Sequence, residues 1–308
     1  MLAQIYKSTG SWYIAKTQSG VVYNARIKGI FKIDGITSTN PVAVGDIVEI
    51  EPEDEAGNNA SIINIIDRKN YFARSSPRHK MQHHIIASNL DQVLIIVTLK
   101  EPRTSQGFID RCLVAAEAYH ISPKIVFNKI DIYKKKEWDA FEKLQNIYTN
   151  IGYSVQKISM KTFEGLDELK NILKNNISLF MGHSGTGKST LINYLLPQLA
   201  LRTSEVSNWS GKGMHTTTFA EMFDLNFDGK IIDTPGIREF AINDMERAEL
   251  SHYFPEMRTL LQNCKFNNCL HIEEPGCAVK NAVEEGEIFM ERYISYYNIL
   301  QTIAEQDY

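Results

Sequence analysis

One stretch of eight residues decides the fold of this chain: Gly182-His183-Ser184-Gly185-Thr186-Gly187-Lys188-Ser189. It has the spacing of a phosphate loop, in which a lysine and a hydroxyl residue follow the second of two glycines. An apolar run at residues 177–181 precedes it, and residues 190–196 have the pattern of a helix. Backbone N–H groups can close around phosphate oxygens in such a loop, beside the positive helix N-terminus. The stretch therefore predicts a nucleotide phosphate site after a buried strand.

Two side chains of this loop have predicted chemical roles. Lys188 is expected to serve catalysis by bridging the β- and γ-phosphates, and the Ser189 hydroxyl to bind Mg²⁺. Further nucleotide contacts are expected from the rest of the loop and the next residue: Gly182, His183, Ser184, Gly185, Thr186, Gly187 and Thr190. Kinases, ATPases and GTPases all share this motif, so it does not identify the base.

A second motif selects the base. Asn128-Lys129-Ile130-Asp131 follows a strand-like run at residues 124–127, at the sheet edge where ligands bind in α/β folds. Asp131 can accept hydrogen bonds from N1–H and the exocyclic amine of guanine, whereas adenine offers an acceptor at N1. Lys129 is expected to lie along the base, and Asn128 to tie this loop to the phosphate loop. Alone, the pattern also fits a surface turn; beside a phosphate loop it predicts a guanine nucleotide.

Two further segments are expected at the same site. Asp233 begins an Asp-Thr-Pro-Gly motif after an apolar run at residues 230–232, and should reach Mg²⁺ through a water. The N–H of Gly236, at the end of that motif, should contact the γ-phosphate. Ser159 follows a strand predicted at residues 154–158 and is expected to support the guanine through backbone contacts.

A glycine-rich segment at residues 211–218 has the character of switch I. One of its threonines, Thr216 or Thr217, is expected to complete the Mg²⁺ shell. The residue after the Asp-Thr-Pro-Gly motif is Ile237, which cannot orient an attacking water as a glutamine does in many GTPases. His215 is our candidate for that polar contact in catalysis; the alternative is a histidine that only orders the loop.

The order of these motifs is unusual. An ordinary GTPase carries the phosphate loop first and the guanine-reading motif last, whereas here residues 128–131 precede residues 182–189, and residues 233–236 follow both. This order predicts a circularly permuted GTPase.

Four regions are predicted along the chain. Residues 1–67 contain short alternating runs, which favour an OB-like β-barrel: 5–8, 12–16, 21–28, 46–51 and 62–66. Residues 68–84 form a basic linker. Residues 85–238 alternate strands (93–99, 124–127, 154–158, 177–181, 230–232) with helices (108–119, 134–147, 165–173, 188–196), which predicts a mostly parallel sheet covered on both faces. Residues 239–308 are predicted to be a helical, zinc-binding domain.

Aromatic residues of the barrel have two interpretations. Tyr6, Trp12, Tyr13 and Tyr23 could stack on bases or fill the barrel and its rim, and the sequence favours filling. In the C-terminal region, Phe289, Tyr293, Tyr296 and Leu300 have helical spacing and indicate packing surface.

The cysteines indicate a metal site. Three of the four cysteines lie in the pattern Cys264-x4-Cys269-x-His271-x5-Cys277. Three thiolates and an imidazole form a closed tetrahedral zinc shell of the structural type. A disulfide suits neither the odd count nor a cytosolic protein, and free core cysteines are the remaining alternative. Cys112 is expected to be a buried apolar residue.

Composition and charge bound the location and partners. The chain has 308 residues, of which 43% are hydrophobic and 23% charged. The N-terminus lacks a signal-peptide pattern and the apolar run at 93–97 is too short to cross a bilayer, so we expect a cytosolic protein without membrane contact.

Residues 68–84 carry five Lys/Arg and no acid, whereas from Glu239 onward five cations face thirteen acids. The basic stretch is either a solvated face or a phosphate contact, and Arg26, Lys28 and Lys32 of the barrel are further candidates for phosphate contact.

Together these motifs resemble the RsgA (YjeQ) family of bacterial circularly permuted GTPases. The resemblance covers nearly the whole chain and rests on the following: Val44-Gly45-Asp46-Ile47-Val48 at the barrel end, the motif order, residues 182–193, residues 211–218 and the cysteine spacing. It implies a GTPase that is stimulated by the 30S subunit, acts in late maturation of 16S rRNA and binds rRNA. It also supports a catalytic role for His215. We expect a monomer.

Two rival functions remain open. A P-loop kinase would prefer adenine, which Asp131 disfavours. An RNA-binding assembly scaffold would use GTP or GDP mainly as a structural ligand.

Overall fold

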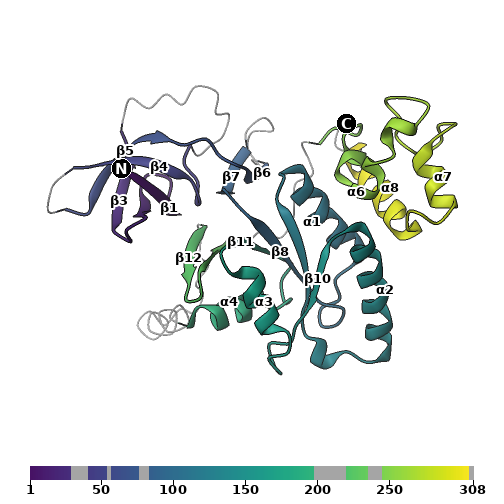
Figure 1. The fold of residues 1–308 in the computed structure, drawn as a ribbon, viewed down its shortest axis with the longest axis horizontal. Coiled ribbons are helices and arrows are strands. Elements are labelled where there is room, and N and C mark those ends of the chain that lie inside the picture. Colours follow the sequence, from purple (N-terminus) through teal and green to yellow (C-terminus); the bar gives the residue numbers. More distant parts are fainter. Residues whose placement is uncertain (29–40, 54–56, 76–82, 198–219, 235–244, 305–308) are drawn as a thin grey trace.

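The computed structural model describes residues 1–28, 41–53, 57–75, 83–197, 220–234 and 245–304. Figure 1 shows the N-terminal strands at one end of the molecule, the helical C-terminal region at the other, and an α/β region between them. One eleven-stranded sheet runs through the N-terminal strands and the α/β region, in the order β10-β9-β8-β11-β13-β12-β1-β2-β3-β5-β4.

The first five strands close into a barrel: β1 (Leu2–Ser8), β2 (Tyr13–Thr17), β3 (Val22–Ile27), β4 (Ile47–Pro52) and β5 (Asn59–Ile65). Strand β1 pairs with both β2 and β4, which closes the circle, and β3 lies parallel to β5. Alternate residues point inward, and apart from Tyr13 the buried barrel core consists of alanine, valine and isoleucine side chains. The predicted OB-like barrel is confirmed.

The barrel aromatics differ in burial. Tyr13 is 1% exposed and belongs to the barrel core, while Trp12 is 49% exposed and lies 6.0 Å from the Arg26 guanidinium. Tyr6 is half-buried between barrel and α/β region, where its hydroxyl donates to Asp224 at 2.6 Å.

A hairpin occupies much of the segment predicted as a linker. Strands β6 (Tyr71–Ser75) and β7 (His83–Ser88) pair antiparallel as a separate two-stranded sheet. The hairpin reaches the barrel through Gly45, whose φ is +97° and where a Cβ would meet the Ser88 carbonyl oxygen at 2.1 Å. Glycine is required there because only the absence of a side chain permits this approach. The linker is therefore structured on both sides of residues 76–82.

The α/β region follows the predicted alternation. Strands β10 (Ser154–Lys157), β9 (Ser122–Phe127), β8 (Gln92–Val97), β11 (Ile177–Met181) and β13 (Gly229–Asp233) are parallel neighbours. Helices α1 (Gln106–Ala118) and α2 (Lys135–Ile151) pack on one face, and α3 (Leu166–Leu173) and α4 (Lys188–Leu195) on the other. Every residue of β8 is buried, as expected for a strand covered on both faces.

Within the α/β region, one strand was not predicted from the sequence. Strand β12 (Glu221–Leu225) is antiparallel to β13 and pairs with β1 at Lys7 and Glu221. It therefore joins the α/β sheet to the barrel.

The C-terminal region has its own core. Its elements are η2 (Leu250–Tyr253), α6 (Pro255–Arg258), η3 (Leu261–Asn263), α7 (Ala278–Glu284) and α8 (Met290–Ala304). They pack together and against Val114 of α1. Among the described residues, no helix is long and apolar enough to span a membrane.

Candidate functional site

The phosphate loop connects β11 to α4 in a conformation that its glycines require. Gly182 has φ +145°, and a Cβ there would meet the Ile96 carbonyl oxygen at 2.3 Å. Gly187 has φ +96°, and a Cβ would meet the Asn128 side-chain nitrogen at 2.3 Å. That nitrogen donates to the Thr186 carbonyl at 2.8 Å. As expected, Asn128 ties the predicted base-reading loop to the phosphate loop.

Two half-buried charged groups, Lys188 and Asp233, lie beside this loop. Burial lowers the pKa of Lys188, an effect that Asp233 opposes, and burial raises the pKa of Asp233, which Lys188 opposes. The Lys188 ammonium donates to the Gly182 carbonyl, within the loop. Ser189 is exposed at the first turn of α4. A hydroxyl and a carboxylate are oxygen ligands of the kind that Mg²⁺ prefers, so the donors present fit that ion.

A cavity of about 290 Å³ lies between the predicted base-reading loop, the loop that follows β10 and the end of the phosphate loop. Its lining includes Asn128, Lys129, Asp131, Met160, Gly187 and Thr190. The Ser159 hydroxyl donates to Asp131 at 2.7 Å and accepts the backbone N–H groups of Lys161 and Thr162 at 3.1 Å. Ser159 thus holds the Asp131 carboxylate with its side chain, whereas the sequence had suggested only backbone contacts from it.

A segment that no motif predicted also lines the site. Residues 98–105 connect β8 to α1 and contact both nucleotide loops. The Lys129 ammonium donates to the Glu101 carbonyl, and a Cβ on Gly185 would lie 3.1 Å from the Pro102 ring. Thr104 lies 2.7 Å from the His183 ring. Its position after a buried strand, at the same sheet edge as the other loops, was the available signal.

Four predicted catalytic residues lie outside the described residues: His215, Thr216, Thr217 and Gly236. Their roles remain predictions.

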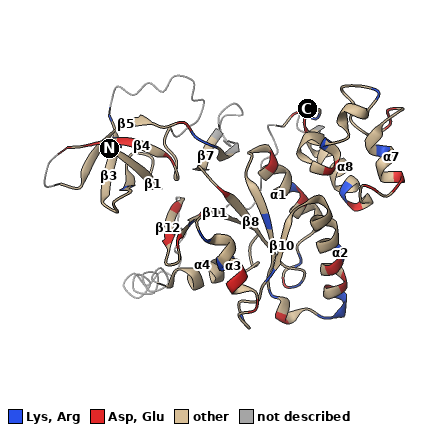
Figure 2. Ribbon diagram, in the orientation of Figure 1, with Lys and Arg blue, Asp and Glu red and all other residues tan. Residues whose placement is uncertain are grey.

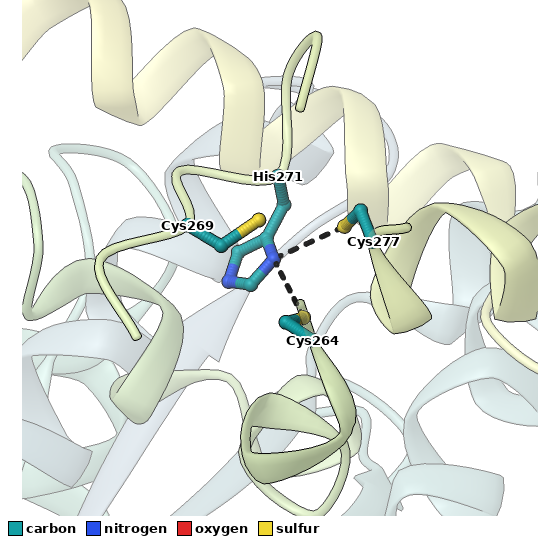
Figure 3. A group of neighbouring side chains, drawn as sticks. All are labelled: Cys264, Cys269, His271 and Cys277. Carbon is teal, nitrogen blue, oxygen red and sulfur yellow. Dashed lines mark hydrogen bonds between the residues drawn. The ribbon is translucent and has the colours of Figure 1, made fainter. Parts of the chain in front are cut away.

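The cysteine pattern forms a compact cluster in the C-terminal region. Ligand atoms of Cys264, Cys269, His271 and Cys277 all lie within 4.8 Å of one another, and Figure 3 shows the four side chains converging. The His271 Nδ1 atom is 3.3 Å from the Cys277 sulfur and 3.7 Å from the Cys264 sulfur. His271 Nε2 is buried with no hydrogen-bond partner among the described residues. Three thiols and one ring nitrogen at these separations fit a tetrahedral zinc ion.

Hydrogen bonds from α8 hold the loop that carries this cluster. The Tyr293 hydroxyl donates to the His271 carbonyl at 2.7 Å, and the Tyr296 hydroxyl to the Leu270 carbonyl at 2.9 Å. These tyrosines, predicted as packing surface, also fix the backbone of the cluster. Cys112 is fully buried in α1, as predicted.

Several cations expected to contact phosphates have acidic partners inside the protein. Arg68 is 12% exposed and pairs at 2.7 Å with the buried Asp46. The other pairs are Lys69–Asp91 (2.9 Å), Arg26–Glu53 (3.1 Å) and Lys28–Glu51 (3.4 Å). Figure 2 shows Lys and Arg interspersed with Asp and Glu over the described part of the chain. Arg68 is therefore primarily a structural residue, and Lys32, Arg78 and Lys80 lie outside the described residues.

The strand order, the phosphate loop at the end of β11 and the cavity beside Asp131 define the class: a circularly permuted P-loop fold with a guanine-nucleotide type of site. The sequence profile of the RsgA GTPase family matches residues 65–243, and that of the RsgA N-terminal domain matches residues 3–60. The chain belongs to the RsgA GTPase family, and the prediction of a GTPase is confirmed.

Full-length relatives agree. A Flavobacterium johnsoniae protein named small ribosomal subunit biogenesis GTPase RsgA is 52% identical over 98% of this chain and 93% of its own. A Bacteroides fragilis protein of the same name is 51% identical over 100% and 99%. The crystal structure of YjeQ from Thermotoga maritima superimposes with a TM-score of 0.80 at 34% identity, covering 98% of each chain. The structure of YloQ, described as a circularly permuted GTPase, gives 0.78 at 30% identity, covering 99% and 95%.

Proposed function

We propose that this protein hydrolyses GTP during late maturation of the small ribosomal subunit, binds 16S rRNA within it, and is stimulated by the 30S particle. The observation that carries the proposal is the 290 Å³ cavity in which Asp131 and the phosphate loop meet. The names of the full-length relatives supply the ribosomal context.

Each site residue has a proposed role. Asp131 reads the guanine edge while Ser159 holds its carboxylate, Lys129 lies along the base, and Asn128 fixes the spacing between the two loops. Backbone groups of residues 182–190 surround the phosphates, and Lys188 neutralises their charge. Ser189 and Asp233 would hold Mg²⁺, which would screen the phosphate charge when bound. Thr216, Thr217 and Gly236 are proposed to sense the γ-phosphate, and His215 to contact the attacking water.

The Cys3His cluster is proposed to hold one structural zinc ion. Because its four donors come from protein, no position is left for an activated water, so the ion would stabilise the C-terminal region rather than act in catalysis.

GTP binding is proposed to change how the barrel and the C-terminal region sit on the small subunit, with release after hydrolysis. The four predicted regions (1–67, 68–84, 85–238, 239–308) are proposed as its units, within a monomer that works in the cytosol where small subunits assemble.

Steady-state GTP turnover with and without purified 30S subunits tests the enzymatic part. Turnover is expected to rise with 30S subunits; a rate that they leave unchanged would remove the stimulation from the proposal. In the same assay, His215→Ala should lower turnover at unchanged GDP affinity, and unchanged turnover would make His215 a loop-ordering residue.

Co-sedimentation tests the switch. More protein should travel with 30S subunits in the presence of a non-hydrolysable GTP analogue than with GDP. Equal retention with both nucleotides, together with negligible turnover, would favour the alternative of an RNA-binding scaffold.

A further inference from the structure

The segment between β8 and α1 contacts the phosphate loop through a buried hydroxyl. Thr104 is 3% exposed, and its Oγ1 accepts the Thr98 N–H at 3.0 Å. The same Oγ1 lies 2.7 Å from Nε2 of His183. On the other side, the Phe108 ring meets the His183 ring edge-on, at 87° and a centroid distance of 5.2 Å. The imidazole is therefore held both by a polar contact and by an aromatic contact.

The directions of the hydrogen bonds that link Thr98, Thr104, His183 and Ser184 follow from the two backbone groups at the ends of this series. Nδ1 of His183 lies 3.1 Å from the Ser184 carbonyl oxygen, which can only accept, so Nδ1 carries the proton. In a neutral ring, Nε2 is then an acceptor, and the Thr104 hydroxyl must donate to it. Thr104 can do so because Oγ1 receives the Thr98 N–H on a lone pair and keeps its own proton available. With the Nδ1–H tautomer, every donor and acceptor in this series of hydrogen bonds has a partner.

His183 in turn positions the part of the phosphate loop that lies between its two end glycines. Its carbonyl accepts the buried Thr186 hydroxyl at 3.0 Å, and the Thr186 carbonyl accepts the Asn128 side chain at 2.8 Å. A displacement of His183 would therefore move the backbone N–H groups that face the phosphates, and also the link to the predicted base-reading loop.

We propose that Thr104 is a positioning residue for the nucleotide phosphates, acting through the His183 ring to hold the phosphate loop in its binding conformation. The inference rests on guanine-nucleotide binding at this site. The β8–α1 segment would then contribute to nucleotide affinity, although it lies outside the phosphate-loop motif.

Thr104→Val removes the hydroxyl at nearly constant volume, and His183→Phe removes both ring nitrogens while keeping a ring against Phe108. Each is expected to weaken binding of GDP and of a non-hydrolysable GTP analogue by about two- to tenfold, the size of one hydrogen bond. The double variant should be no weaker than either single variant, because both remove the same contact. Thr104→Ser should restore the affinity. Additive losses, or wild-type affinity in Thr104→Val, would overturn the proposal.

Ser178→Ala is the matched control. Ser178 lies on β11, and its fully buried hydroxyl accepts a hydrogen bond from the Gln92 side chain at 2.9 Å. Removing this hydroxyl should leave nucleotide affinity unchanged. A wild-type protein that does not bind GDP would instead refute the proposed function itself.

Two spectroscopic readouts separate positioning from general destabilisation. In a ¹⁵N-labelled protein, the His183 ring should show the Nδ1–H tautomer, and its Nε2 resonance should shift in Thr104→Val and return in Thr104→Ser. The ³¹P resonance of the β-phosphate of bound GDP should shift in the same two variants in parallel. An unmoved phosphorus resonance despite a shifted Nε2 would leave Thr104 as a structural residue only. Should Thr104→Val not fold, His183→Phe and Thr104→Ser carry the same comparison.

Discussion

At the residue scale, the site is organised by short polar contacts to groups that face the cavity. Asp131 is the clearest case, because the Ser159 hydroxyl fixes one oxygen of its carboxylate at 2.7 Å. The carboxylate is thereby oriented toward the cavity that also borders Gly187 and Thr190. Base selectivity should then depend on the charge and hydrogen-bond pattern of this one side chain.

Asp131→Asn should exchange guanine for xanthine selectivity. The amide cannot accept two hydrogen bonds from N1–H and the exocyclic amine of guanine, but it can donate to the additional oxygen of xanthine. GDP affinity is expected to fall by about 10- to 100-fold, the range for a hydrogen bond to a charged group, while XDP affinity rises. Fluorescent-nucleotide competition measures both.

Asp139→Asn, an exposed acid on α2, is the control and should change neither affinity. Unaltered GDP binding by Asp131→Asn would mean that the base is read elsewhere.

Local spacing in the sequence is enough to nominate the residues of a motif, but it cannot reveal partners that only the fold brings together. The residues of the phosphate loop and of the Asn-Lys-x-Asp motif could be named because their chemistry dictates their order along a loop. Thr104 could not, since its partner His183 is 79 residues away and meets it only when β8 and β11 lie side by side. The side-chain role of Ser159 likewise depends on β10 lying next to β9.

At the element scale, helix α1 is the main contact between the α/β region and the C-terminal region. Arg292 of α8 is fully buried and pairs at 2.5 Å with Asp110 of α1 and at 2.6 Å with Glu256 of α6. The Tyr148 hydroxyl of α2 also donates to Asp110, at 2.8 Å. Burial alone would lower the pKa of Arg292, but the two carboxylates raise it above its usual value. The guanidinium therefore stays charged.

Arg292→Met should be among the most destabilising substitutions in the chain. It leaves the buried Asp110 without its counter-ion, a change that costs about 3–5 kcal/mol. Chemical denaturation followed by tryptophan fluorescence measures the loss.

Arg258→Met provides the comparison, since Arg258 is 52% exposed and pairs with Glu117 at 3.3 Å. It should cost less than about 1 kcal/mol. Equal losses in the two variants would show that the buried pair has no special weight.

The cysteine cluster leads to a prediction about metal. The purified protein should contain about one zinc per chain, and Cys264→Ser should lower that content and the stability of the C-terminal region. Cys112→Ala should keep the metal, because Cys112 lies in α1 outside the cluster. Elemental analysis with thermal unfolding before and after chelation decides the question. A metal-free wild-type protein with unchanged stability would leave the cluster as free thiols.

Elements were predicted where the local pattern was strong. The buried run of β8 and the helices that follow each strand were found because their periodicity is set by the two covered faces of the sheet. Strand β12 was missed since its five residues alternate only weakly and its two partners, β13 and β1, lie on either side of it in the sheet. The β6–β7 hairpin was missed because basic charge dominated a segment whose strand character depends on pairing.

At the scale of the whole molecule, the barrel and the α/β region share one sheet. Strand β12 pairs with β13, which ends at Asp233, and with β1 of the barrel. Side chains reinforce this junction, because Asp224 of β12 accepts from Tyr6 and Lys16, both at 2.6 Å. A displacement of the barrel on a partner surface would thus reach the strand beside the predicted Mg²⁺ ligand.

Asp224→Asn should weaken this link. We expect basal GTP turnover to stay the same and stimulation by 30S subunits to fall on the order of threefold, in the range of measured coupling energies between distant sites. Glu53→Gln is the control, since Glu53 pairs with Arg26 within the barrel itself and should leave stimulation unchanged. Full stimulation of Asp224→Asn would argue that the barrel signals by another route.

The single sheet also sets the order in which this chain can fold as it is synthesised. The barrel strands all lie within the first 65 residues, so the barrel can close early, whereas the Glu221 that pairs with Lys7 emerges 214 residues later. Strands β8, β9 and β10 are also made before β11, so β8 waits with an unpaired edge until the phosphate-loop strand arrives. Strands β12 and β13 come after β11 and complete the layer, so the sheet that joins the barrel to the predicted nucleotide site can close only once Asp233 has been made.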